Sequence, residues 1–77
     1  MDRSRQLQHL EQAQRHVLRG EQNVSDQEQR IEDFENQGYD VTLARALLDT
    51  FLRTQVQFVV HRDLILRELK SDLNECL

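Results

Sequence analysis

Three consecutive residues, His61, Arg62 and Asp63, are side chains that could take part in phosphoryl transfer. With Leu64 they match the His-Arg-Asp-Leu catalytic loop of protein kinases, in which the Asp accepts the proton of the substrate hydroxyl. That loop also needs an Asn five residues after the Asp, where this chain has Glu68. The sequence has no Gly-rich phosphate loop, and 77 residues can form only one small domain. We therefore expect that the protein is not an enzyme.

The three histidines are the other candidates for binding a ligand. His9 and His16 lie seven residues apart, which is about 10 Å along a helix and too far to share one ion. His16 and His61 could meet if the chain folds back on itself, and Glu11 or Asp63 could then complete a zinc site. A small ligand- or metal-responsive regulator is therefore an alternative function. The simpler interpretation is polar histidines at an interface, with no cofactor.

Charge and hydropathy argue against nucleic-acid and membrane partners. The net charge is −4 with both signs interspersed, so no basic stripe is available to neutralise phosphates. The runner-up alternative, a nucleic-acid-binding regulator, would use Arg3, Arg5, Arg15 and Arg19. The longest apolar runs have three residues, whereas a membrane-spanning helix needs about 20. Without an apolar N-terminal signal, the expected compartment is the cytoplasm, where Cys76 would be an ordinary free thiol.

The composition and the apolar spacing predict an all-α protein. The chain has two glycines and no proline, and it is rich in residues that favour helices or helix caps. Apolar residues recur every seven positions in the first half, which predicts a coiled-coil-like helix over about 5–37. The members of this row are Leu10, Val17, Val24 and Ile31. A second row, three residues further on, contains Ala13, Gly20, Gln27 and Phe34.

Gly38 predicts the end of the first helix, because glycine readily adopts the left-handed conformation found after helix ends. Asp40 is placed to cap a second helix over about 41–72, so residues 38–40 form the turn of a single helical-hairpin domain spanning 1–77. A three-helix alternative breaks the first helix near Gly20 and restarts it at a capping box over Ser25–Glu28. The uninterrupted sevenfold spacing favours one continuous helix.

A turn at residues 38–40 fixes an antiparallel pairing that matches small residues with large ones. Phe34 then faces Ala44, Gly20 faces Phe58 and Ala13 faces Ile65, so a small residue meets a bulky one in three of the four layers. The fourth layer pairs Gln27 with Phe51. Such complementary sizes favour close packing of the two helices. The predicted core of the hairpin consists of Leu10, Val17, Gly20, Val24, Ile31, Phe34, Ala44, Leu47, Leu48, Phe51, Phe58, Ile65 and Leu69.

The second helix has more apolar surface than the first helix can cover. This surplus predicts an interface, because large exposed apolar patches usually mark interaction sites. The predicted interface residues are Leu52, Val56, Val59, Val60 and Leu66. We expect a homodimer in which two hairpins form a four-helix bundle, and hence a self-associating module for protein–protein interaction. The alternatives are a monomer with partly exposed leucines and valines, or docking of a different, unidentified protein.

From His16 to Leu69, the chain resembles a group of short bacterial proteins of unknown function, frequent in rhizobia and their relatives. The shared pattern is a Gly-Glu pair, a polar helix ending in Ile-x-x-Leu/Phe-Glu, a Gly-His/Tyr-Asp turn, an Ala-x-x-Leu-Leu-x-x-Phe segment, and closing Arg-Asp and Glu-Leu pairs. Matching residues are Gly20, Glu21, Ile31, Phe34, Glu35, Gly38, Tyr39, Asp40, Ala44, Leu47, Leu48, Phe51, Arg62, Asp63, Glu68 and Leu69. The resemblance implies a bacterial cytosolic hairpin and brings no activity or site.

Overall fold

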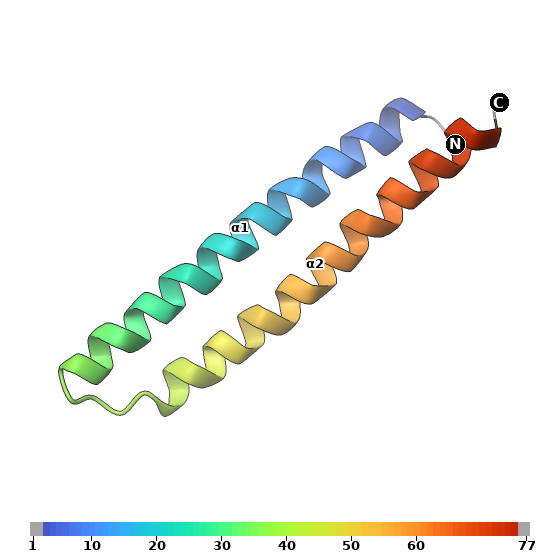
Figure 1. Ribbon diagram of the computed structural model, residues 1–77. Helices are drawn as coiled ribbons and strands as arrows, with labels where there is room; N and C mark the ends of the chain where they lie inside the picture. The colour runs from blue at the N-terminus through green and yellow to red at the C-terminus, as the bar shows by residue number, and fades with distance from the viewer. Residues whose placement is uncertain (1–2, 76–77) are drawn as a thin grey trace.

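Two antiparallel α-helices pack side by side as a hairpin in the computed structural model, which describes residues 3–75 (Figure 1). Helix α1 spans Arg3–Asn36 and helix α2 spans Thr42–Glu75. The all-α hairpin prediction is therefore confirmed. Helix α1 continues through Gly20 and Ser25, so the three-helix alternative is wrong. The hairpin is long and narrow, with extents of 61 × 15 × 15 Å. Neither helix, over the described residues, is long and apolar enough to cross a membrane.

Helix α1 ends in a Schellman motif built on Gly38. Gly38 has a φ of +79°, a conformation that costs glycine little because it has no Cβ. The Tyr39 N–H donates to the Phe34 carbonyl at 2.9 Å, and the Gly38 N–H donates to the Glu35 carbonyl at 3.0 Å. The Phe34 and Tyr39 rings meet edge to face, with centroids 6.0 Å apart. These contacts satisfy the last carbonyls of α1 and turn the chain back.

Asp40 caps α2 as the sequence predicts. Its carboxylate accepts hydrogen bonds from the Thr42 hydroxyl at 2.7 Å and from the Thr42 backbone N–H at 3.0 Å. Both bonds lower the pKa of the Asp40 carboxyl below its ordinary value of 3.8, and the bond from the hydroxyl has the larger effect. An ion pair between Arg45 and Glu35 joins the two helices beside the turn. Short-range contacts therefore stabilise the turn at the end of α1 and at the start of α2.

The best-buried apolar cluster lies near the open end of the hairpin. It consists of Ala13, Ile65 and Leu69, with Leu10 packed against it. Val17 and Ile31 continue the buried row of α1. Of the other predicted core residues, Gly20 is buried and Val24, Ala44, Leu48, Phe51 and Phe58 are half-buried. Phe34 and Leu47 remain 38% and 43% exposed. For Phe34 the reason is that its ring packs on Tyr39 in the turn.

The expected pairing agrees with the structure near the open end, where Ala13 and Ile65 are buried in one cluster, but it differs by about one turn closer to the turn. The nearest side chain to Gly20 is Gln55, whereas Phe58 packs against the His16 ring at a centroid distance of 5.2 Å. The side-chain amide of Gln27 donates to the backbone carbonyl of Ala44. The expectation that Gly20 admits Phe58 is therefore wrong. The expected pairing was based on side-chain size alone, whereas the long side chains of Gln27 and Gln55 also form hydrogen bonds between the helices.

Two glutamines connect the helices in opposite directions. The side-chain amide of Gln55 donates to the Val17 carbonyl of α1, and that of Gln27 donates to the Ala44 carbonyl of α2, both at 2.9 Å. Near the open end, Gln6 donates to the Glu68 carboxylate at 2.9 Å. These polar contacts sit within the seam itself, because Gln6 and Gln27 are only 5% and 3% exposed. They fix how far one helix is displaced along the other.

Candidate functional site

The most prominent surface feature is a row of exposed apolar side chains along α2. Leu52, Val56, Val60 and Leu64 are 47%, 63%, 52% and 49% exposed. They are spaced four residues apart, so they form one continuous ridge that winds gently around the helix. The other predicted interface residues, Val59 and Leu66, are half-buried at the flank of the ridge. We call Leu52, Val56, Val60 and Leu64 the α2 ridge.

Leu64 belongs to the ridge, as the sequence indicates, because it falls at or beyond the edge of the face that the two helices share and lies four residues after Val60. The five predicted interface residues do not include it. Helix α1 also exposes leucines, Leu7 and Leu18, at 48% and 64%. These two are eleven residues apart with mainly polar residues between them, so they form no comparable ridge.

Charged residues alternate with the apolar ones on the outer face of α2. Asp49 and Arg53 form an ion pair one turn apart at 2.9 Å, with both side chains more than half exposed. Further along the helix, Asp63 accepts from Arg62 at 3.2 Å, and Arg67 is exposed. Such exposed pairs contribute little to the stability of a single chain. They do provide a pattern of signs that a partner surface can match.

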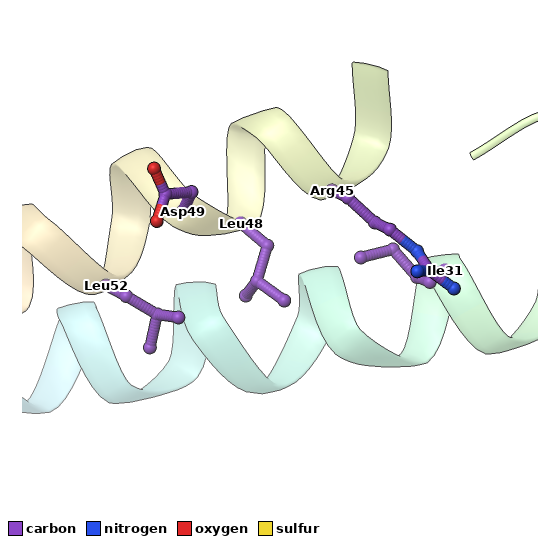
Figure 2. Close-up of a pocket in the computed structure, with 5 residues that line it drawn as sticks. All are labelled: Ile31, Arg45, Leu48, Asp49 and Leu52. Carbon is purple, nitrogen blue, oxygen red and sulfur yellow. The ribbon is translucent and has the colours of Figure 1, made fainter. Parts of the chain in front are cut away.

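An apolar groove begins at the turn end of the ridge. It has a volume of about 450 Å³ and is lined by Ile31, Arg45, Leu48, Asp49 and Leu52. Figure 2 shows Leu48 and Leu52 pointing from α2 towards α1, while Arg45 extends towards Ile31 and Asp49 points away. Leu52 therefore belongs to both the groove and the ridge, which makes the two features one surface.

A smaller hollow of about 100 Å³ lies on the ridge itself, between Val60, Asp63, Leu64 and Arg67. These four residues follow the spacing i, i+3, i+4, i+7. That is the arrangement of a coiled-coil hole, which receives one side chain from a facing helix. The hollow has two apolar residues and two of opposite charge, so it fits an amphipathic helix.

The three histidines line one hollow between the helices, with His9 and His16 on α1 and His61 on α2. The hollow has a volume of about 310 Å³, and Gln12 and Ala13 also line it. His16 also packs on Phe58. Among the described residues, no group of three or more His, Cys, Asp or Glu side chains is arranged to hold a metal ion. The hollow could therefore offer a metal at most two of these ligands.

The remaining candidates lie apart from these surfaces or outside the described residues. His61, Arg62 and Asp63 are consecutive residues within α2. His61 faces the histidine hollow, while Asp63 lines the hollow on the outer face. Arg15 is paired with Glu11 at 2.6 Å, and Cys76 lies outside the described residues.

Searches of family models, curated proteins and solved structures find no match to the chain.

Proposed function

We propose that this protein is a non-enzymatic, self-associating helical module for protein–protein interaction. Its first partner is a second copy of itself, and two hairpins joined through α2 form a homodimeric four-helix bundle. The observation that carries the proposal is the α2 ridge, whose four apolar side chains are about half exposed or more. We further propose that the module acts in the bacterial cytoplasm, in regulation or signalling.

The small core of the hairpin supports this proposal. Only five apolar residues are buried over the described part of the chain, namely Ala13, Val17, Ile31, Ile65 and Leu69. A chain of this length rarely gains more than a few kcal/mol from one core. Covering the α2 ridge would add apolar burial at about 25 cal/mol per Å². Association therefore supplies stability that the single hairpin lacks.

Glutamate at the centre of the ridge tests the proposal. We expect Val56→Glu and Val60→Glu to shift the protein from dimer to monomer, because each would place a charge in the apolar contact. The measurement is sedimentation equilibrium across a hundredfold concentration range. Leu18→Glu is the matched control, since Leu18 is an exposed leucine on α1 and its change should leave association intact. A wild type that stays a 9.2 kDa monomer throughout would overturn the proposal.

A ligand- or metal-responsive regulator is the second candidate function. The observation in its favour is the convergence of His9, His16 and His61 on one hollow. We rank it second because two-histidine coordination leaves most of a metal's coordination sphere to solvent. Titration with Zn²⁺, followed by the histidine ring signals in NMR, compares the two candidates. Micromolar binding that His61→Ala abolishes would place this function first.

A further inference from the structure

We infer that the second molecule docks antiparallel along α2, with the two-fold axis beside position 58. This inference rests on the proposed self-association and adds the orientation and register of the two helices. Phe58 itself packs against His16 of α1. Val56 and Val60 lie about 160° around the helix from Phe58, so they point outwards, where the second molecule must approach.

The α2 ridge is symmetric about position 58, which is what a two-fold contact requires. Val56 and Val60 are each two residues from it, and Leu52 and Leu64 are each six residues from it. In an antiparallel pair, a residue on one helix faces the residue at the same distance on the other side of the axis. Val56 therefore faces Val60 of the second copy, and Leu52 faces Leu64. Every ridge residue meets an apolar counterpart.

The charges beside the ridge are complementary in the same register. Asp49 and Arg67 are each nine residues from position 58, and Arg53 and Asp63 are each five residues from it. Asp49 therefore faces Arg67 of the second copy, and Arg53 faces Asp63. Because the contact is two-fold, each pairing occurs twice. Together with the Asp49–Arg53 pair at 2.9 Å, they would form a four-charge network at each end of the contact.

Neighbouring registers lose this complementarity. If Val56 lay on the axis, Asp49 would face Asp63. If Val60 lay on the axis, Arg53 would face Arg67. Like charges facing each other suppress the wrong pairing. One register of the antiparallel helices therefore satisfies both the apolar ridge and its charges.

The separation of these charges also selects the angle between the helices. Asp49 lies about 13 Å along the helix from the two-fold axis. A crossing angle near 50° between the two α2 helices would therefore separate Asp49 from Arg67 of the second copy. The shallow angle of about 20°, which is typical of helix bundles, keeps the pair together. The hollow formed by Val60, Asp63, Leu64 and Arg67 then receives Leu52 of the second copy, on the Leu64 side.

Charge reversal tests the register. We expect Asp49→Arg and Arg67→Asp each to raise the dimer dissociation constant about tenfold or more at low salt, because each creates two like-charged pairs. Mixing the two variants should restore wild-type affinity to within about threefold, since a heterodimer has both pairs matched. The double variant Asp49→Arg/Arg67→Asp should also recover. Sedimentation equilibrium at low salt provides each constant, and circular dichroism checks folding.

Recovery can come only from contact between molecules. Residues 49 and 67 lie about 27 Å apart along one helix, too far apart for their side chains to meet within one molecule. Arg19→Asp, the same charge change at an exposed site on α1, is the matched control and should not rescue Asp49→Arg. Equal rescue by Arg19→Asp, or no rescue in the mixture, would overturn the antiparallel register while leaving the dimer standing. A wild type without self-association would overturn both proposals.

Discussion

Gly20 and Gln55 show how a single pair of residues holds the two helices in register. A Cβ on Gly20 would lie 1.6 Å from Oε1 of Gln55, so a larger residue at position 20 requires the end of the Gln55 side chain to move. The same amide donates to the Val17 carbonyl at 2.9 Å, and Oε1 has no hydrogen-bond partner among the described residues.

We expect Gly20→Ala to be neutral or to destabilise the hairpin by up to about 1 kcal/mol, although alanine is the better helix former, because the loss of one hydrogen bond offsets the gain in helix propensity. The new methyl group must displace the Gln55 amide and break its bond to Val17. In a Gln55→Ala background, the same change should instead stabilise the hairpin by up to about 1 kcal/mol. Urea unfolding of the four proteins gives the coupling energy. Stabilisation by Gly20→Ala in both backgrounds would show that Gln55 does not occupy the space beside Gly20.

At the scale of the helices, a seam containing buried glutamines explains how α1 and α2 are aligned. Gln27 is 3% exposed and donates to Ala44 across the interface. Its Oε1 has no hydrogen-bond partner among the described residues. Polar residues at seam positions typically specify register at a cost in stability. Gln27 has this role in α1, and Gln55 has it in α2.

If the buried glutamines specify register at a cost in stability, a more apolar seam should raise the free energy of unfolding of the hairpin. Gln27→Met keeps the length of the side chain and removes the unpaired oxygen, so it should be neutral or stabilising by up to about 1 kcal/mol. Gln27→Glu has the same shape but buries a charge, and should cost about 3 kcal/mol. Thermal unfolding of the two variants beside the wild type makes the comparison. A clear loss of stability in Gln27→Met would mean that the bond to Ala44 outweighs the unpaired oxygen.

At the scale of the whole molecule, the hairpin is long for the core it encloses. Its extents of 61 × 15 × 15 Å leave each helix covered on one side only. In Figure 1, α1 is the only helix beside α2 among the described residues. The four residues of the α2 ridge are 47–63% exposed. The symmetry of the α2 ridge favours a second copy of the protein as the partner that buries these side chains.

If folding and association are coupled, the melting temperature must depend on protein concentration. We expect a rise of roughly 3–6 °C for each tenfold increase in wild-type concentration. Val56→Glu should melt at a lower temperature that is nearly independent of concentration, because the variant unfolds as a monomer. Calorimetry at three concentrations is sufficient. A wild-type melting temperature that stays constant would separate folding from association.

The helices, the turn and the amphipathic pattern could be predicted from the sequence, because these features depend on residues close together in the chain. Sevenfold spacing specified α1, and the types of Gly38 and Asp40 specified where one helix ends and the next begins. These are local effects of backbone conformation and capping, which a short stretch of sequence encodes in full.

The register of the two helices and the exposure of individual side chains could not be predicted without the packed structure. Gly20 meets Gln55 and not Phe58, because hydrogen bonds to the opposite backbone compete with size matching. Val59 is half-buried while Leu64 is exposed, and three separate histidines share one hollow. Each of these outcomes depends on side chains far apart in sequence, and on a displacement of one helix along the other that periodicity leaves free.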